Sequence, residues 1–376
     1  MLRSLPRTSW LFSPVEDLLA FAAPAALSLL LAAYLSSKGL LSAPLSPVGW
    51  LLSVVFVDVA HVWATIYRVY TDPAERRRRL PLYAGLPAAA YAASVLLYAL
   101  SALTFWRALA YLAVFHFIRQ QYGWIRLANH RDRWLSDAAT PPAAGRLAAL
   151  DPHLDGAAIY LGTLYPLVYW HGHLPRSFHW FVAGDFLLTA PPWLVTLAHH
   201  AWLIVGVLWS LRQLVRFVST RTLPVAKILV MTSTWATWYL GIVHWNSDVA
   251  FTVTNVLPHG IPYFVLLYRY WSSPAVPYSH PTSTPRIPSA RALWLSLPLF
   301  LLPLLVIAFV EEALWDRLVW HDHAVLFPLP AIDTPPALLA LLVPLLALPQ
   351  STHYLLDAWI WRVGPQNPDL RRRLGL

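Results

Sequence analysis

Long apolar stretches separated by short polar, proline-rich segments dominate this chain. A helix needs roughly 20 apolar residues to cross the hydrocarbon core of a bilayer, and windows of that size recur throughout the sequence. We predict ten membrane-spanning helices, at 16–36, 48–69, 82–104, 106–127, 156–175, 193–211, 227–245, 248–269, 291–310 and 337–360. The 33 prolines fall mostly between these segments, in stretches such as "TAPPW" and "DTPPA", which are typical chain breaks. No internal repeat and no soluble domain interrupts the series, so residues 1–376 are predicted to form a single membrane domain.

Composition supports this all-α, polytopic reading. Only 12% of the residues are charged, whereas a soluble protein carries roughly 25%. The 20 Trp and 17 Tyr residues fit the aromatic belts at the two membrane surfaces. The first apolar stretch has no small-residue cleavage site, so we expect a true span there and not a signal peptide.

The positions of the basic residues predict the topology. If the spans alternate from a cytoplasmic N-terminus, 22 of the 27 Lys and Arg residues fall on the inner side. Membrane proteins concentrate Lys and Arg in cytoplasmic segments. Both termini are therefore predicted to be cytoplasmic, as in a multi-pass protein of a bacterial-type inner (plasma) membrane. The outer loops are expected to hold the acidic residues Glu311, Glu312, Asp316, Asp322 and Asp333. Topology and attraction to anionic membrane lipids account for the net charge of +9, so no nucleic-acid partner is expected.

Several predicted spans contain ionisable residues, which cost roughly 2.5 kcal/mol or more at mid-membrane. Asp58 and His61 lie at i and i+3 in the second span, and His353 and Asp357 lie at i and i+4 in the tenth. Each pair therefore shares one face of its helix. The fourth span adds His116. A polar face on an otherwise apolar helix indicates a polar interior of the bundle.

The eighth span contributes His259 within the stretch "LPHGIPY". The neighbouring Pro258, Gly260 and Pro262 are expected to break this helix, and broken helices often line a cavity. All four of these spans run in the same direction under the predicted topology, with their His residues near or below mid-membrane. The side chains are therefore expected to meet.

Convergent imidazole and carboxylate groups are typical of metal sites in helix bundles. The chain has no cysteine, so sulfur ligands are excluded and nitrogen and oxygen donors remain, which suit iron, manganese or zinc. We predict one or two ions, with iron first, and the candidate ligands are Asp58, His61, His116, His259, His353 and Asp357. Either carboxylate can instead accept the far N–H of a ligating His. A His in a membrane helix can also serve simply as an interhelical hydrogen-bond donor.

Two further residues of the fourth span are candidates for a catalytic role. Gln120 lies one turn from His116, and Arg119 is next to it. Arg119 cannot act as a ligand because its guanidinium stays protonated, so we expect a counter-charge or an anchor for an acidic substrate group. The aromatic residues expected to line a substrate pocket are Trp63, Tyr67, Tyr122, Tyr263 and Trp359.

A second set of histidines falls near the outer ends of the predicted spans. These are His171, His173, His179, His199, His200, His244, His321 and His323. Histidine near a membrane surface needs no special partner, and "HGH" and "HDH" are too short to define a site. Interface residues are the preferred interpretation, and an outer metal or haem site is the alternative.

Several catalytic motifs are absent from the sequence. There is no His-Glu-x-x-His, no Gly-x-Ser-x-Gly, no P-loop and no dinucleotide fingerprint. The histidine boxes of membrane desaturases are also missing, since His199–His200 lacks the preceding His. The plan of many spans with His and Asp on separate helices resembles bacterial carotene-cleaving membrane dioxygenases. No motif matches them residue by residue, so no residue role is taken from that resemblance.

The sequence favours a metal-dependent membrane oxidoreductase of the oxygenase, hydroxylase or desaturase type. Its substrate would be a lipid, an isoprenoid or another hydrophobic molecule from the bilayer, and an electron donor would be a partner. A proton- or ion-coupled transporter is the first alternative, because broken helices and buried Asp/His pairs also occur there. A haem-binding electron carrier with two axial His is the second.

Overall fold

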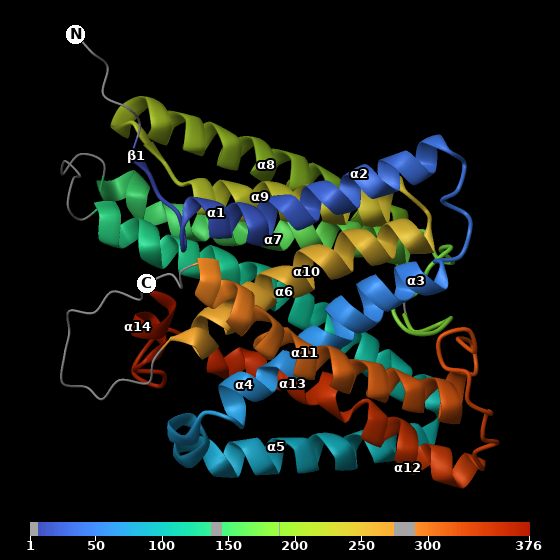
Figure 1. The fold of residues 1–376 in the computed structure, drawn as a ribbon. Helices are drawn as coiled ribbons and strands as arrows, with labels where there is room; N and C mark the ends of the chain where they lie inside the picture. Colours follow the sequence, from blue (N-terminus) through green and yellow to red (C-terminus); the bar gives the residue numbers. More distant parts are fainter. Residues whose placement is uncertain (1–6, 137–144, 188, 274–289) are drawn as a thin grey trace.

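The computed structural model describes residues 7–136, 145–187, 189–273 and 290–376. It is all-helical, with 78% helix and 1% strand, and its long helices run roughly side by side in one bundle (Figure 1). With η for π-helical segments, the elements are β1 (Arg7–Thr8), α1 (Pro14–Asp17), η1 (Leu18–Ala22), α2 (Ala23–Ser37), α3 (Pro47–Trp50), η2 (Leu51–Val59), α4 (Ala60–Val69), α5 (Pro73–Leu100), α6 (Ala102–Ser136), α7 (Gly145–Gly172), α8 (Pro192–Thr220), β2 (Thr222–Leu223), α9 (Val225–Trp238), η4 (Tyr239–His244), α10 (Asp248–Ser272), α11 (Ala290–Trp315), η5 (Asp316–Trp320), α12 (Pro336–Leu346), α13 (Leu348–Ile360) and α14 (Leu370–Leu374).

Seven helical stretches in the described residues are long and apolar enough to cross a membrane. They are Pro14–Ser37, Pro47–Val69, Pro73–Leu100, Pro192–Thr220, Asp248–Ser272, Leu295–Trp320 and Pro336–Ile360. The other three predicted spans fall on α6, α7 and α9 with η4, which are helical but not among the seven. Polar residues such as His116, Arg119 and Gln120 on α6 lower its hydropathy. A helix packed inside a bundle can be less apolar than one that faces lipid.

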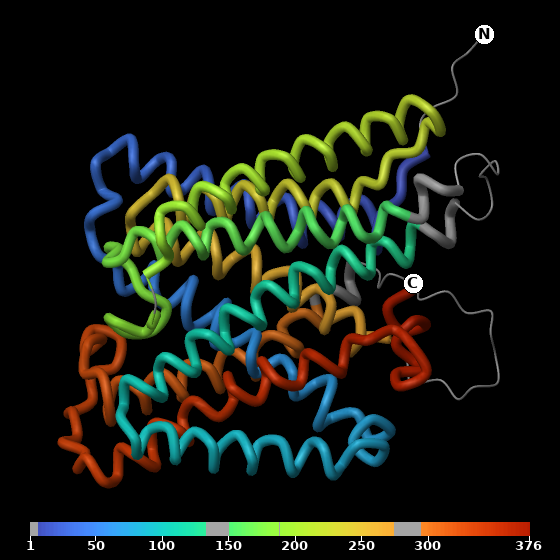
Figure 2. Tube along the Cα trace, turned by 180° about the vertical axis from the view of Figure 1, so that it is seen from behind, coloured from blue at the N-terminus to red at the C-terminus, as the bar shows by residue number. Residues whose placement is uncertain are grey.

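The burial of the helices distinguishes the centre of the bundle from its edge. Two thirds (67%) of the most apolar part of α10 is buried, whereas only 6% of α5 and 11% of α8 is buried. Figures 1 and 2 place α8 and α5 on opposite edges of the bundle. Exposed apolar side chains such as Leu96 on α5 and Val207 on α8 cover these edges. A surface of this kind suits contact with lipid.

Local capping signals in the sequence define where several helices begin. Asp72 caps α5, since its Oδ1 accepts hydrogen bonds from the backbone N–H groups of Ala74 (2.9 Å) and Glu75 (3.1 Å). Pro73 follows at the first helical position, where its missing N–H costs nothing. Ser247 caps α10 in the same way, through the backbone N–H of Ala250.

The predicted break in α10 is wrong, because the helix continues without interruption from Asp248 to Ser272. The two internal prolines each remove one backbone N–H, which a packed helix can tolerate. Gly260 has a packing role: a Cβ there would lie 2.7 Å from Val57 Cγ1 and 3.1 Å from the Val57 carbonyl oxygen. The glycine thus lets α10 approach η2 closely, next to His259.

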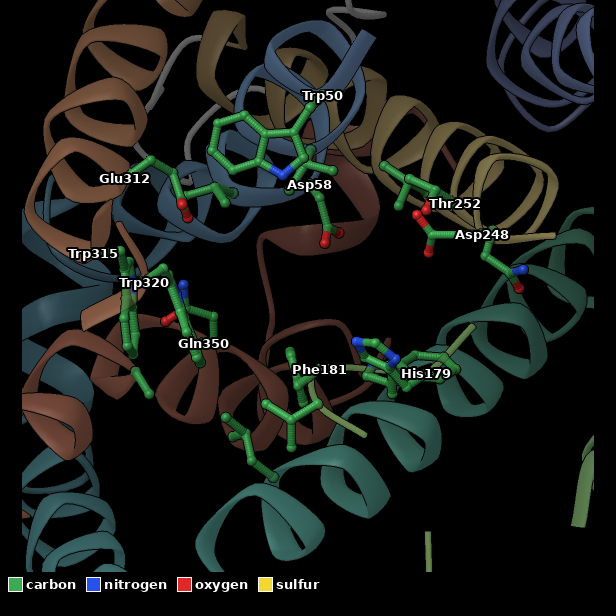
Figure 3. A pocket seen from close by; sticks show the side chains of 18 of the residues that line it. Trp50, Asp58, His179, Phe181, Asp248, Thr252, Glu312, Trp315, Trp320 and Gln350 are labelled. Atoms are coloured by element: carbon green, nitrogen blue, oxygen red, sulfur yellow. The ribbon is translucent and has the colours of Figure 1, made fainter. Parts of the chain in front are cut away.

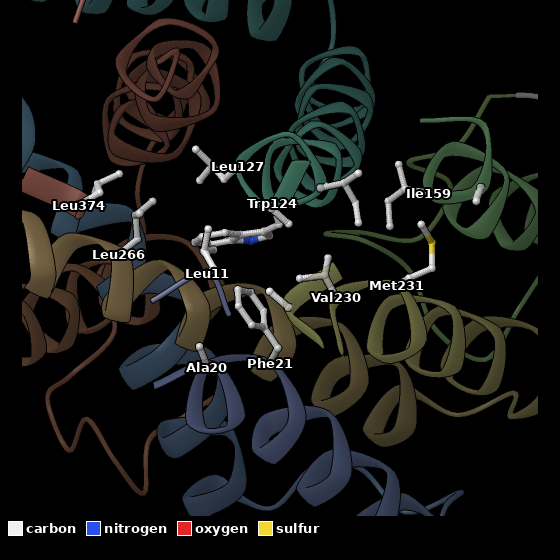
Figure 4. Close-up of a cluster of buried hydrophobic side chains, with 14 of the residues drawn as sticks. Leu11, Ala20, Phe21, Trp124, Leu127, Ile159, Val230, Met231, Leu266 and Leu374 are labelled. Carbon is white, nitrogen blue, oxygen red and sulfur yellow. The ribbon is translucent and has the colours of Figure 1, made fainter. Parts of the chain in front are cut away.

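A buried apolar cluster packs the half of the bundle that contains the N-terminal helices. Phe21 meets the edge of Trp124 at a ring-centroid distance of 5.1 Å. Leu11, Ile159, Met231 and Leu266 surround this pair (Figure 4). The cluster joins η1, α6, α7, α9 and α10, so it fixes helices that are distant in the sequence against one another.

The expected place of Glu311 and Glu312 in an outer loop is also wrong. The helix that contains the ninth predicted span, α11, continues past them to Trp315, and both side chains are buried. Glu311 accepts hydrogen bonds from the indole N–H groups of Trp63 and Trp315 and from the Gln350 amide. These donors offset the cost of burying the carboxylate.

The first and last described residues lie at the same end of the bundle, where β1 pairs with β2 and α14 packs nearby (Figure 1). Buried Arg68 forms an ion pair with Glu75 at 2.9 Å and donates hydrogen bonds to Tyr270 (2.8 Å) and Asn367 (2.9 Å). This network connects α4, α5, α10 and the C-terminal segment. The C-terminal residues are therefore part of the folded bundle.

We expect Arg68→Ala to destabilise the protein by about 3–5 kcal/mol, because it leaves the buried Glu75 carboxylate without one of its partners. The measurement is reversible unfolding of the full chain in detergent. Arg76→Ala, at an exposed arginine next to Glu75 on α5, is the control and should cost less than about 1 kcal/mol. Equal losses in the two variants would contradict a structural role for the network.

The same network predicts a loss of stability in acid. Burial alone would raise the pKa of Asp72, but the Tyr270 hydroxyl, the Glu75 backbone N–H and the Arg373 charge hold this pKa below its usual range. A carboxyl with a lowered folded-state pKa stabilises the fold above its unfolded-state value of about 3.9, and this contribution is lost as the pH falls below it. Unfolding measured from neutral pH to about 2 should show this acid-induced loss, and Asp72→Asn should reduce it.

Candidate metal centre

Four helices bring four histidines to one point inside the bundle. His61 lies on α4, His116 on α6, His259 on α10 and His353 on α13, and each is at most 2% exposed. One ring nitrogen of each lies within 4.8 Å of one ring nitrogen of every other. Donor atoms this close together can bind one metal ion. The predicted convergence of these four residues is therefore present in the structure.

The imidazole rings are arranged around a common centre and not stacked in a row. His61 meets His259 and His353 at centroid distances of 4.7 Å and 5.0 Å, and His116 meets the same two rings at 5.2 Å and 4.6 Å. Adjacent rings are strongly inclined to each other, by 63° to 90°. This edge-to-face arrangement groups the four rings without stacking them on one another.

Each of the four rings has a nitrogen without a protein partner. The Nε2 atoms of His61, His116, His259 and His353 are all buried without a hydrogen bond, as is Nδ1 of His259. Buried polar groups are almost always hydrogen-bonded, because an unmade bond in the interior costs roughly 1–3 kcal/mol. Four buried rings that meet at one point, each with an unpartnered nitrogen, are therefore best explained by a bound ligand.

The Nδ1 atoms of two rings contact groups of the surrounding helices. His61 Nδ1 lies 3.3 Å from the Val57 carbonyl oxygen, one turn earlier in the chain. His353 Nδ1 lies 2.7 Å from the Thr65 hydroxyl. A proton on Nδ1 leaves the Nε2 lone pair free, so these contacts select the tautomer that a metal ligand requires.

The Thr65 contact continues to a carboxylate. The Thr65 hydroxyl lies 3.0 Å from the Tyr263 hydroxyl, which donates a 2.8 Å hydrogen bond to Asp357 Oδ1. Trp361 Nε1 also donates to Asp357, at 3.2 Å. If every group donates in the same direction, the chain runs from His353 through Thr65 and Tyr263 to Asp357. Such a chain orients the His353 ring and increases its basicity.

The two predicted carboxylate ligands lie beside the four-histidine group and not within it. Asp357 lies 3.8 Å from Nδ1 of both His116 and His353, and Asp58 lies 3.6 Å from Nδ1 of His61. Asp58 is in the π-helical segment η2, where the wider turn changes the direction of its side chain. Both carboxylates face the Nδ1 side of the rings, which fits outer partners better than direct ligands.

Two aromatic rings pack directly on the imidazoles. Phe117 stacks on His259 at 3.5 Å between ring centroids with an interplanar angle of 7°, and Tyr354 stacks on His116 at 4.9 Å. Phe117 directly follows His116 in the sequence, and Tyr354 directly follows His353. These contacts hold the rings in place and exclude water from the nitrogens.

The two predicted catalytic residues of α6 lie in different places. Gln120 donates a 2.8 Å hydrogen bond from its amide to the backbone carbonyl of His259, so it supports the helix that carries a site histidine. Arg119 is exposed and contacts Tyr160 of α7 and the face of Tyr122, which is on α6 itself. The structure therefore does not bring Arg119 to the four histidines.

Sequence reasoning overlooked Thr65 as a site residue, although a helical signal was available. Thr65 follows His61 by four residues, and Tyr263 follows His259 by four. Residues at this spacing share a helix face.

The other aromatic residues predicted to line a substrate pocket lie in different places. Trp63 borders a cavity beside the histidines, Tyr67 packs on Phe300, Tyr122 packs on Tyr160, and Trp359 is 40% exposed.

The outer histidines do not form a second group in the described part of the chain. The four-histidine group is the one set of three or more potential ligands found there. His171 contacts Tyr111 and His173 stacks on Tyr169. His199 packs on Tyr165. These contacts agree with the interpretation of the outer histidines as interface residues.

Two cavities approach the four histidines from different sides. The smaller one, which we call the side cavity, has a volume of about 330 Å³ and contains His353 and Thr65 in its wall. The rest of its lining is mostly apolar and includes Val62, Ile66, Pro87, Leu345, Leu348 and Leu356. A larger cavity of about 570 Å³ is lined by Asp58, Phe117 and Tyr354 next to the histidines and extends to His323 in the loop after η5 (Figure 3). Val62 borders both.

Comparison with known proteins gives no match: no family model, no curated protein and no solved structure is similar to this chain. Function must therefore be argued from the site.

We expect Asp357→Asn to weaken metal binding about 10- to 100-fold, which is the usual effect of removing an outer partner of ligating histidines. Asparagine keeps the size and the hydrogen bond from Tyr263 but removes the charge. Competition with a chelator in detergent measures the affinity. Asp333→Asn, at an exposed position, is the control, and unchanged affinity in Asp357→Asn would contradict the role of this carboxylate.

Proposed function

We propose that this protein is a membrane-embedded, metal-dependent oxidoreductase with a non-haem iron centre that acts on a hydrophobic substrate from the bilayer. The observation that carries the proposal is the set of four buried, unpartnered Nε2 atoms whose rings surround one point. His61, His116, His259 and His353 would hold the metal. When bound, such an ion supplies Lewis acidity and redox chemistry in a site closed to bulk water.

The donor set restricts the choice of metal. Four imidazoles without thiolate or a carboxylate in the first group suit iron, copper, nickel or zinc better than calcium or magnesium. One group of four nitrogens favours one ion over two. We propose iron because its redox chemistry suits the apolar surroundings of the site, with zinc as the next candidate; manganese, which prefers oxygen ligands, fits four imidazoles less well.

The charge around the site favours a divalent cation. Four neutral imidazoles leave the positive charge of the ion uncompensated in a buried place, where an unpaired charge is costly. Asp58 and Asp357 supply two negative charges behind the rings, at 3.6–3.8 Å from Nδ1 atoms. The ion and the two carboxylates would stabilise one another through the imidazoles.

The side cavity suggests how a hydrophobic substrate would reach the metal. Its 330 Å³ is lined mostly by apolar side chains, and His353 lies in its wall. Pro87 of α5 is also in its wall, and only 6% of the apolar part of this helix, at the edge of the bundle, is buried. A hydrocarbon chain can enter from lipid there without crossing a polar surface. The substrate class would be a lipid or an isoprenoid.

The fold fits an orientation with ten spans and both termini in the cytoplasm of a bacterial-type cell. The described chain ends lie at the same end of the bundle, which an even number of crossings requires. Arg68, the arginines of α5, Lys227 and the arginines of α14 lie on the predicted cytoplasmic side. An electron donor would then approach from that side.

The two alternatives have less support from the geometry. The unbroken α10 removes the broken-helix argument for a transporter. A haem between two of the histidines would need space for a flat macrocycle, whereas the rings surround one point at centroid distances of 4.6–5.2 Å.

The proposal predicts about one iron per chain, since one group of four nitrogens holds one ion. The measurement is the metal content of protein purified in detergent without chelator. His116→Ala and His353→Ala should each lose most of the metal, because each removes one of four ligands. His199→Ala, at a histidine that packs on Tyr165 away from the site, should retain it.

Two outcomes would refute the metal site: wild-type protein without metal after growth in iron, manganese and zinc, or stoichiometric metal in the His116→Ala, His353→Ala double variant. Nitric oxide, added without oxygen to the ferrous protein, tests for an open coordination position through its electron paramagnetic resonance signal. Absence of that signal in iron-loaded protein would argue against dioxygen chemistry.

A further inference from the structure

The larger cavity has an unusual charge pattern for a basic protein. Four carboxylates line it, from Asp58, Asp248, Glu312 and Asp322. No Lys or Arg is among the described residues of its wall, although the chain has a net charge of +9. A cleft lined by charges of one sign attracts ions of the opposite sign, more strongly where the walls are of low dielectric. We call this space the acidic cavity.

Glu312 is the residue that needs explanation. Only 9% of this residue is exposed, and it lines the acidic cavity. The described residues provide it with neither a hydrogen bond nor an ion pair, in contrast to its neighbour Glu311, which has three donors. The charged groups that act on Glu312 are all acidic: Glu311, Asp58 and Asp316. A cation in the cavity would relieve this repulsion.

The walls indicate what kind of cation would fit. Aromatic rings line the acidic cavity on several sides: Trp50, Trp106, Phe117, Trp180, Phe181, Phe251, Trp315, Trp320 and Tyr354. In Figure 3 the Glu312 carboxylate lies between Trp50 and the pair Trp315 and Trp320, and Asp58 is directed toward the same open centre. Trp faces attract organic cations such as quaternary ammonium groups.

A metal ion fits the acidic cavity less well. In the described part of the chain, the four-histidine group is the one set of three or more donors close enough to hold an ion, so these carboxylates do not form a second set. Hard cations also prefer several oxygen ligands at short range. The volume of about 570 Å³ suits an organic molecule.

We propose that the acidic cavity binds an organic cation, an amine or a quaternary ammonium compound, with its positive charge next to Glu312 and between tryptophan faces. The cavity extends from the loop residues Asp322 and His323 to Phe117 and Tyr354, which stack on site histidines. A ligand of this class would thus lie directly beside the four-histidine group. Binding does not require the metal, so this inference goes beyond the proposed function.

The test uses the full-length protein in a non-ionic, zwitterion-free detergent. Tetramethylammonium and choline are titrated calorimetrically, with 3,3-dimethylbutan-1-ol as the neutral molecule of the same shape as choline. We expect saturable binding of the two cations and about tenfold weaker binding of the alcohol, because it lacks the charge that Glu312 would pair with. Glu312→Gln should weaken cation binding about tenfold or more.

Matched variants keep the test independent of folding and of the metal. Asp333→Asn removes an exposed carboxylate outside the cavity and should leave binding unchanged. Trp320→Leu, at a side chain that is 37% exposed, should weaken cation binding about fivefold without affecting the alcohol. His353→Ala should lose metal but retain cation binding, which separates failure of this inference from failure of the metal site.

Three results would overturn the proposal. One is equal binding of choline and the alcohol, which would mean an apolar pocket. Another is displacement of tetramethylammonium by Mg²⁺ or K⁺ at equal concentration, which would mean that the cavity binds cations without selectivity for organic ones. The last is unchanged binding in both Glu312→Gln and Trp320→Leu.

Discussion

Four unpartnered imidazole nitrogens in the interior of an apolar bundle are the constraint on which the rest of the site depends. Burial of polar atoms without hydrogen bonds is costly, and here each of four neighbouring imidazole rings carries such an atom. The structure around them reduces the freedom of the rings through stacking on Phe117 and Tyr354. A bound metal ion would convert the cost of burial into a gain, since it would satisfy all four nitrogens at once.

The surrounding helices provide the support that a precise site requires. Gly260 allows close contact between α10 and η2, and the Thr65–Tyr263–Asp357 chain connects α4, α10 and α13 behind His353. At the end of the bundle that contains the C-terminus, the Arg68 network connects α4 and α10, together with α5, to the C-terminal segment. Packing thus couples the position of the histidines to that of residues far from them.

The two cavities give the site two different environments. The side cavity is apolar and borders an exposed helix, whereas the acidic cavity is aromatic and negatively charged and extends toward loops. They share Val62, the residue after His61. This separation would let a hydrophobic molecule and a cationic one approach the same histidines without competing for one surface.

The sequence by itself determined the helical class and the identity of the central residues. Ionisable residues are so unfavourable in apolar helices that His61, His116, His259 and His353 could be selected without a structure. Spacing along one helix also paired Asp58 with His61 and Asp357 with His353, because residues three or four apart share a face. The same spacing contained the signal for Thr65.

Tertiary structure decided what local patterns cannot encode. The direction of Arg119 depends on which face of α6 packs inward, and only the bundle places it against Tyr122 and Tyr160. The prolines of α10 indicated a break, but packing on both sides kept the helix continuous. Glu311 and Glu312 ended the apolar pattern at 310, yet the helix continues to Trp315, and Trp63 and Gln350 donate hydrogen bonds to Glu311 from other helices. Hydrogen bonds and cavities between distant segments are properties of the assembled bundle, so the sequence alone could not show them.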